Sequence, residues 1–125
     1  MGNPTRGVRP RTRILFLDDE VPVVAVISRL LQQKQYDVVT AHSADAGRAL
    51  LENGTGIRCA VVDVDLGEGK ENGLEFVAWL KTMRPNVGVI VVSAHEQHAV
   101  PTGVTFIPKP FTTDQLVGAI ERECA

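Results

Sequence analysis

Apolar and polar positions fall in blocks along this chain rather than alternating residue by residue. Five short apolar segments, rich in β-branched residues, are separated by longer and more polar stretches. Most of these segments are apolar at consecutive positions, which is typical of strands covered on both faces, as in a parallel sheet. The five predicted strands are residues 14–17, 38–41, 60–64, 87–92 and 104–107.

The stretches between these strands carry the pattern of amphipathic helices. In the first stretch, apolar side chains recur at the spacing of one helical face, at Val23, Val26, Ile27, Leu30 and Leu31. A second helix is expected over residues 44–52, capped by Ser43 and ended by Asn53-Gly54. A third is expected around Leu74–Leu80 and should end before Pro85. Thr112 or Thr113 should cap the last helix. Residues 94–103 leave room for two helical turns at most.

This alternation of strand and helix predicts one open α/β domain with helices on both faces of the sheet. Right-handed crossovers leave few topologies, and a flavodoxin-like parallel five-stranded sheet of order 2-1-3-4-5 fits the length best. The fourth helix is expected to be shortened. We expect the domain to cover residues 13–124 and to follow a flexible basic arm over residues 1–12, where Arg6, Arg9 and Arg11 lie near Pro4, Gly7 and Pro10.

The composition narrows the class of protein but does not indicate which reaction or ligand it is suited to. The chain has 125 residues, 44% of them hydrophobic and 22% charged, which suits one soluble globular domain. A formal net charge of -2 gives no reason to expect that this domain binds nucleic acid. No apolar stretch is long enough to span a membrane, and no signal peptide is evident, so a cytoplasmic protein is the default expectation. Cys59 and Cys124 are expected to form no disulfide framework, with Cys59 a small buried residue.

Polar side chains follow four of the predicted strands. Asp18, Asp19 and Glu20 follow the first, Asp63 and Asp65 the third, Ser93 the fourth and Lys109 the fifth. Each group alone has a structural explanation, such as a helix terminus, a turn or an exposed lysine. Together they should meet at one edge of the sheet, because ligands of such folds bind outside the carboxyl ends of the strands.

The types of residue at this edge indicate phosphoryl transfer. Neighbouring carboxylates cannot all be ionised without a proton or a cation, and an all-oxygen site suits Mg²⁺. A lysine opposite them suits an anion, and an aspartate can act as the nucleophile and form an aspartyl phosphate.

The ordered set of motifs resembles the receiver domain of bacterial two-component response regulators, the chemotaxis-regulator fold. The resemblance covers roughly residues 13–124, and its motifs are Leu17-Asp18-Asp19-Glu20, Val61-Val62-Asp63-Val64-Asp65-Leu66, Gly73-Leu74-Glu75, Val91-Val92-Ser93-Ala94 and Lys109-Pro110-Phe111.

The resemblance implies a role for each matching residue. Asp63 would be the phosphoacceptor. Asp18 and Asp19 would be the acidic pair that holds Mg²⁺, with Asp19 the direct ligand and the backbone carbonyl of Asp65 a further one. Ser93, with Ala94 after it, would be the switch hydroxyl, Lys109 the conjugate lysine and Phe106 the aromatic switch. Asp65 and His95 would tune the lifetime of the phosphorylated state.

Spacing within the sequence favours Asp63 over Asp65 as the nucleophile. Asp63 lies 44 residues after Asp19 and 30 residues before Ser93, and both separations are typical of the resembled family. The implied mechanism is Mg²⁺-dependent transfer from the phosphohistidine of a histidine kinase or a histidine phosphotransfer protein. Conformational switching and autodephosphorylation would follow. The domain would catalyse only its own phosphorylation and dephosphorylation, and would act on an output domain or a downstream protein.

The sequence departs from the resembled pattern in two places. Only 16 residues separate Ser93 from Lys109, so the fourth helix should be missing or reduced to a turn around residues 95–100. The loop from Asp63 to Gly73 is longer than usual and has Gly67 where the family commonly has proline.

Other classes of protein stay open at this point. A pseudo-receiver would keep the fold as a binding module without accepting phosphate. Asp63-Val64-Asp65 also resembles the start of the haloacid-dehalogenase phosphatases, although their motif lies on the first strand. The glycines at 67 and 69 match neither a dinucleotide fingerprint, because Asn72 stands at the third position, nor a P-loop. His95 and His98 lack a further ligand set and suit a surface pair.

Overall fold

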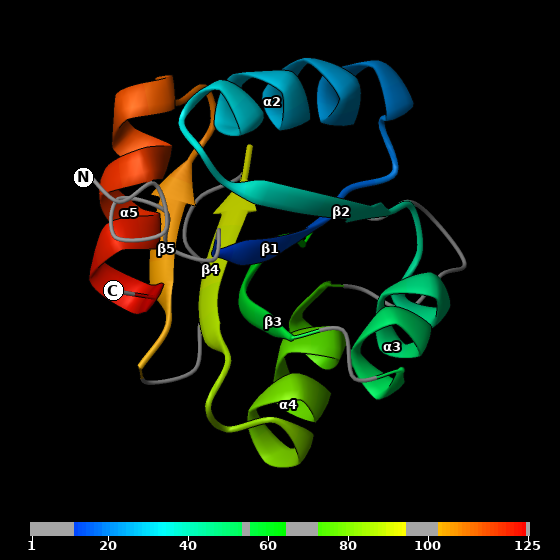
Figure 1. Cartoon of the computed structure of the whole chain (residues 1–125). Coiled ribbons are helices and arrows are strands. Elements are labelled where there is room, and N and C mark those ends of the chain that lie inside the picture. The colour runs from blue at the N-terminus through cyan, green and yellow to red at the C-terminus, as the bar shows by residue number, and fades with distance from the viewer. Residues whose placement is uncertain (1–11, 54–55, 65–72, 95–102, 125) are drawn as a thin grey trace, which may run out of the picture.

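A parallel five-stranded sheet forms the centre of the molecule, in the order β2-β1-β3-β4-β5 (Figure 1). The computed structural model describes residues 12–53, 56–64, 73–94 and 103–124. The strands are β1 (Arg13–Leu17), β2 (Asp37–Ala41), β3 (Ile57–Asp63), β4 (Gly88–Ser93) and β5 (Thr105–Pro108). The sequence-based prediction of a flavodoxin-like α/β fold with this strand order is confirmed.

Four helices cover the sheet in the described part of the chain. They are α2 (Val21–Gln33), α3 (Ala44–Glu52), α4 (Gly73–Met83) and α5 (Thr113–Cys124). Helices α2 and α5 lie on one face, and α3 and α4 on the other (Figure 1). The expected caps are present: the Ser43 hydroxyl accepts from the Ala46 N–H at 3.1 Å, and Thr112 exchanges hydrogen bonds with Gln115 at the start of α5.

Successive residues of the central strands pack into two separate hydrophobic cores, one on each face of the sheet. Leu15 and Leu17 of β1 pack toward α3 and α4, whereas Ile14 and Phe16 pack toward α2 and α5. All four are fully buried, so both faces of the strand are covered. This explains why the apolar positions are consecutive in the sequence, because side chains alternate between the two faces of a strand.

The strand bounds differ slightly from the predicted ones. β3 begins at Ile57 rather than at residue 60, because Ile57 pairs with β1 and Cys59 pairs with both β1 and β4, even though the predicted apolar run starts after them. It ends at Asp63, one residue before the predicted end. The predicted shortening of the fourth helix around residues 95–100 lies outside the described residues, and so does the predicted basic arm over residues 1–12, except for residue 12.

The expectation that the two cysteines form no disulfide framework is wrong. Cys59 of β3 and Cys124 of α5 form a disulfide with a Cα–Cα distance of 5.8 Å. Their separation of 65 residues hides this proximity in the sequence, but α5 packs across β3 and β4 and brings its last turn to the strand. Cys59 is fully buried, as expected.

The last turn of α5 is also held close to the sheet by its neighbours. The backbone of Glu123 lies so near Gly88 that a Cβ on this glycine would come within 2.6 Å of the Glu123 carbonyl oxygen. The Thr105 hydroxyl donates to the Glu123 carboxylate. The end of α5 is therefore in contact with β3, β4 and β5.

No helix in the described residues is long and apolar enough to cross a bilayer.

Candidate functional site

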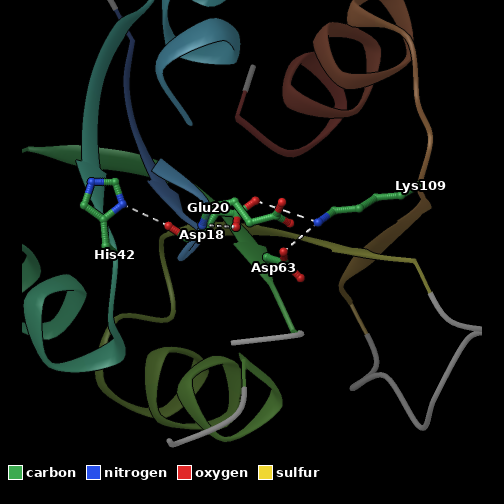
Figure 2. Close-up of polar contacts among 5 residues, drawn as sticks. All are labelled: Asp18, Glu20, His42, Asp63 and Lys109. Atoms are coloured by element: carbon green, nitrogen blue, oxygen red, sulfur yellow. Dashed lines mark hydrogen bonds and ion pairs between the residues drawn. The ribbon is translucent and has the colours of Figure 1, made fainter. Parts of the chain in front are cut away.

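The carboxyl ends of β1, β3 and β5 bring two aspartates and a lysine together (Figure 2). Asp18 and Asp63 are 0% and 1% exposed. The Lys109 Nζ lies 2.6 Å from Asp63 Oδ2 and 3.8 Å from Asp18 Oδ2. A buried carboxylate is costly unless it is paired, so this ion pair explains how Asp63 is tolerated at the centre of the sheet.

Asp63 is positioned by the end of β3 and by a close approach of α4. The next residue, Val64, donates its N–H to the Val92 carbonyl at 3.1 Å, and its own carbonyl accepts from the Gly73 N–H at 3.3 Å. A Cβ at Gly73 would lie 2.5 Å from the Asp63 carbonyl oxygen. Only glycine fits here, and the fit fixes the backbone that carries the Asp63 carboxylate.

Asp18 is held on both sides of its backbone by the end of β2. Its N–H donates to the Ala41 carbonyl at 3.1 Å, and the His42 Nδ1 lies 3.0 Å from its carbonyl oxygen. A carbonyl oxygen only accepts, so His42 must carry a proton on Nδ1. Figure 2 shows His42 on the far side of Asp18 from Lys109, where it supports the backbone without entering the carboxylate group.

Three carboxylates could together hold a metal ion. Oxygen atoms of Asp18, Glu20 and Asp63 all lie within 4.8 Å of one another. Asp18 Oδ1 accepts from the Glu20 N–H at 2.9 Å, whereas Asp18 Oδ2 is buried and has no hydrogen-bond partner among the described residues. One lysine does not balance three carboxylates. The unsatisfied oxygen and the excess negative charge fit a hard divalent cation such as Mg²⁺.

Lys109 stays positively charged at neutral pH. Burial acts to lower the pKa of its ammonium group, but the hydrogen bond and the charge of Asp63, with the charges of Asp18 and Glu20, raise the pKa above its ordinary value. The site therefore contains a permanent cation next to a carboxylate, which suits it to an incoming anion.

An apolar groove of about 420 Å³ borders this site between α2 and the start of α5. Asp18, Glu20 and Lys109 lie at its edge, and Val23, Ile27 and Phe111 contribute apolar lining. A molecule that reaches Asp63 from this side would rest on an apolar surface while facing the charged groups.

The whole described fold matches one known family. The family model described as "Response regulator receiver domain" matches residues 14–121. The chain belongs to this family. The receiver domain resembled in the sequence is thereby confirmed, and with it membership of the two-component phosphoacceptor class.

Relatives of this receiver domain include longer regulators. The chain is 34% identical to the alginate biosynthesis transcriptional regulatory protein AlgB of Pseudomonas aeruginosa, over 83% of this chain and 24% of that protein. It is 30% identical to the nitrogen assimilation regulatory protein NtrX of Azorhizobium caulinodans, over 87% and 25%. The receiver domain thus spans about a quarter of the length of these relatives.

Solved structures agree on the fold. The CheY-like receiver domain protein of Methanospirillum hungatei superposes with a TM-score of 0.83 at 24% identity, covering 92% of this chain and 94% of that one. The receiver domain of NtrX from Brucella abortus superposes with a TM-score of 0.76 at 27% identity, covering 89% and 97%.

The predicted switch residues lie at the ends of β4 and β5. Ser93 is fully buried at the end of β4, and its carbonyl accepts from the Lys109 N–H at 2.8 Å. Ala94 follows it and is exposed at the rim of the groove. Phe106 pairs in register with Val91 and packs, partly buried, on the core under α3 and α4. These placements put Ser93 and Lys109 in direct backbone contact.

The structure does not bring Asp19 into the carboxylate group, and two other predicted residues are not described. Asp19 is half-buried and outside the three-carboxylate group, so its role as a metal ligand stays a prediction. Asp65 and His95 lie outside the described residues, and so do residues 65–72 of the loop before Gly73.

Two residues of the site were missed by the sequence analysis. Glu20 was noted beside the acidic pair but was not predicted to share a metal ion with Asp18 and Asp63. His42 was not noted at all, since it lies 24 residues from Asp18. The predicted strand order contained a signal for it, because the residue after β2 must lie beside the residue after β1.

Proposed function

We propose that this receiver domain accepts a phosphoryl group on Asp63 from the phosphohistidine of a histidine kinase or a histidine phosphotransfer protein. The observation that carries the proposal is the 2.6 Å contact between Lys109 Nζ and the buried Asp63 Oδ2, beside the buried Asp18 and the exposed Glu20. This arrangement places a carboxylate at the end of a strand, beside a cation that can offset the charge of a phosphoryl group.

The chain's own residues supply the positions and charges for transfer. An Asp63 carboxylate oxygen attacks the phosphorus, the P–N bond to the donor imidazole breaks, and its electrons stay on the imidazole. Lys109 offsets negative charge on the transferred group, as positioned cations do in phosphoryl transfer. The apolar groove, with Asp18, Glu20 and Lys109 at its edge, would offer the donor protein a surface beside the site.

Asp18, Glu20 and Asp63 would hold Mg²⁺ in this proposal, with Asp19 and the backbone carbonyl of Asp65 as the further ligands that the family resemblance implies. The ion, when bound, neutralises charge on the phosphoryl oxygens. Calorimetric titration of Mg²⁺ into Asp19→Asn and Glu20→Gln variants separates the two candidate ligands. The variant that removes a direct ligand should show the larger loss of affinity.

The switch would follow from the contacts between β4 and β5. The phosphoryl group adds negative charge and acceptor oxygens, which the Ser93 hydroxyl and Lys109 would engage. Ser93 and Lys109 already share a 2.8 Å backbone hydrogen bond, so a shift of one would move the other. Phe106 lies three residues before Lys109 and would be affected by the same shift. Asp65 and His95 are proposed to set the lifetime of the aspartyl phosphate.

We place this chemistry in the cytoplasm, where the receiver domain would modify only itself and act on an output domain or a downstream protein. The domain's formal net charge of -2 gives it no nucleic-acid role of its own in this proposal.

Mass spectrometry after treatment with acetyl phosphate and Mg²⁺ tests the proposed acceptor. The wild type should gain one phosphoryl group, and Asp63→Asn should gain none. An adduct that persists in Asp63→Asn would assign the nucleophile to another residue. A wild type without any adduct would instead favour a pseudo-receiver. Multiple turnover of a phosphate ester that is lost in Asp65→Asn would favour a phosphatase.

A further inference from the structure

The disulfide between Cys59 and Cys124 lies on the same side of the sheet as the phosphoacceptor but at the other end of β3. Cys59 and Asp63 are four residues apart, so their side chains share a face of the strand at a separation of about 13 Å. Cys59 sits among the side chains under α2 and α5, and Cys124 belongs to the last turn of α5. The bond therefore joins the central strand to the end of the last helix.

The two sulfur atoms differ in how a small molecule could reach them. Cys59 is 0% exposed, whereas Cys124 is half-buried. A hollow of about 80 Å³ opens beside Cys124, and Thr12, Tyr36 and Glu121 also line it. Cys124 is thus the sulfur that a thiol or a disulfide in solution could attack, while Cys59 can react only from inside the core.

The redox state of the compartment determines whether this disulfide is permanent or reversible. Its assignment to a reducing compartment rests on the proposed cytoplasmic function. Reducing compartments keep most thiols reduced, and the disulfides found there are usually transient, catalytic or redox-sensing. We propose that Cys59 and Cys124 form a reversible redox site, which fastens the last turn of α5 to β3 when it is oxidised and releases this tether when it is reduced.

Oxidation by a low-molecular-weight disulfide proceeds in two exchanges. The Cys124 thiolate attacks one sulfur of the small disulfide and expels one small thiolate, which leaves a mixed disulfide on Cys124. The Cys59 thiolate then attacks the Cys124 sulfur and expels the second small thiolate. The protein loses two electrons and two protons in total, and the small disulfide gains them as two thiols.

Reduction should loosen the end of α5 without releasing the helix. Glu123 still contacts Gly88 and accepts from Thr105, so the helix keeps its place on β4 and β5. The change falls on the turn around Cys124 and on the amino half of β3. Asp63 and Lys109 lie at the opposite end of the strand, which leaves the phosphoacceptor chemistry available in both redox states.

A redox titration tests the assignment directly. The wild type is equilibrated in mixtures of reduced and oxidised glutathione, quenched with acid, alkylated and weighed. We expect a reversible conversion between a doubly alkylated form and a form that has lost two hydrogen atoms and takes no alkyl group. Two alkylated cysteines at every ratio of reduced to oxidised glutathione would overturn the proposal, and so would a bond that reduced glutathione never opens.

Single variants test the order of attack. Cys59→Ala should hold one glutathionyl group on Cys124, whereas Cys124→Ser should hold none on the buried Cys59. Equal labelling of both variants would contradict the assigned roles.

Hydrogen exchange tests the tether itself. Amides of residues 121–124 and of the amino half of β3 should exchange several-fold more slowly in the oxidised protein than in the reduced one. Identical amide exchange rates in the oxidised and reduced forms would overturn the proposal that the disulfide tethers α5 to β3. Acetyl phosphate labelling of both forms is a separate readout, because failure of labelling would count against Asp63 as acceptor while leaving the thiol result intact.

Discussion

The carboxyl end of β3 holds a buried charge, whereas the amino half of the same strand holds a covalent bond. Asp63 is 1% exposed and depends on Lys109, which comes from the loop after β5. Cys59 is 0% exposed and is joined to α5 by the disulfide. Both positions are almost fully buried, yet Asp63 depends on an electrostatic partner, whereas Cys59 depends on a covalent bond to the half-buried Cys124.

This contrast indicates that function and stability are separated along one strand. A buried carboxylate contributes little net stability, because its desolvation offsets the attraction of its partner. A cross-link between distant residues contributes mainly to stability, because it restricts the unfolded chain. Changes at the Cys59 end should therefore alter the free energy of unfolding, and changes at the Asp63 end should alter the rate of phosphoryl uptake.

The largest expected effect is the loss of the bridge. For cysteines 65 residues apart, opening the disulfide should lower the free energy of unfolding by about 4 kcal/mol. Denaturant unfolding of the oxidised and the reduced wild type measures this difference. The Cys124→Ser variant should match the reduced wild type under both conditions. Equal free energies of unfolding for the two redox forms would show that the Cys59 end of β3 does not stabilise the fold through its disulfide.

Next in size is the loss of the cation at the other end of the strand. Lys109→Ala should slow phosphoryl uptake from acetyl phosphate by about 100-fold, the usual cost of removing one group that stabilises developing charge. Lys109→Arg keeps the charge but replaces a compact ammonium with a planar fork, so it should recover only part of the rate. An unchanged rate in Lys109→Ala would mean that the ion pair serves only to accommodate the buried Asp63.

Gly73→Ala should affect both properties, because it disturbs the backbone of Asp63 directly. The new Cβ would lie 2.5 Å from the Asp63 carbonyl oxygen and from Val64 Cα, so the strand end or α4 must move. Such overpacking should cost about 2 kcal/mol in unfolding free energy and slow phosphoryl uptake.

Gly118→Ala in α5 is the matched control, since the nearest atom to its new Cβ would be Arg122 Nη1 at 4.0 Å. It should stabilise the protein slightly, by about 0.5 kcal/mol or more, because alanine favours a helix. If both alanine variants behaved alike, the close approach at Gly73 would not be what positions Asp63.

His42→Ala should produce a smaller and more selective effect. Loss of the 3.0 Å hydrogen bond to the Asp18 carbonyl should weaken Mg²⁺ binding by about fivefold, equivalent to a net hydrogen bond of about 1 kcal/mol. His42→Asn should restore binding, because its amide can donate from nearly the place of Nδ1. Calorimetric titration of Mg²⁺ compares the three proteins, and equal affinities would show that β2 gives Asp18 no support through this side chain.

The smallest effect concerns alkaline pH. Lys109 has a raised pKa in the folded protein, so its protonated form contributes stability in full below the ordinary lysine pKa of about 10.4. That contribution is lost as the pH rises through the higher folded pKa. The difference in unfolding free energy between wild type and Lys109→Met should stay constant up to about pH 10 and change above it. A difference that changes between pH values of about 6 and about 8 would point to a different titrating group.

Local patterns in the sequence predicted most of the fold. Consecutive apolar positions such as Val61 and Val62 identified strands covered on both faces, and Ser43 and Thr112 identified helix starts. Strand order then brought Asp18, Asp63, Ser93 and Lys109 to one edge. These predictions succeeded because each depends on spacing within a segment or on the common rules of parallel sheets.

Contacts across the fold were harder to predict. The pairing of Cys59 with Cys124 depends on where the last turn of α5 crosses β3, which no local pattern specifies. The contact of His42 with Asp18 depends on a rotamer at the end of a neighbouring strand. Glu20 joins the carboxylates because the chain turns into α2 directly after Asp18, and the sequence does not show the direction of that turn.

The close approach between Gly88 and Glu123 has a consequence for anyone who builds chimeric regulators. Any exchange of α5 between receiver domains meets a constraint here, because this helix fits only above a strand that begins without a side chain. A donor helix grafted here keeps its register only if glycine stays at position 88. Conversely, this α5 moved to another receiver needs a glycine at the corresponding start of β4. The last helix and the first residue of the fourth strand form one transplantable unit, although 35 residues separate Gly88 from Glu123 in the sequence.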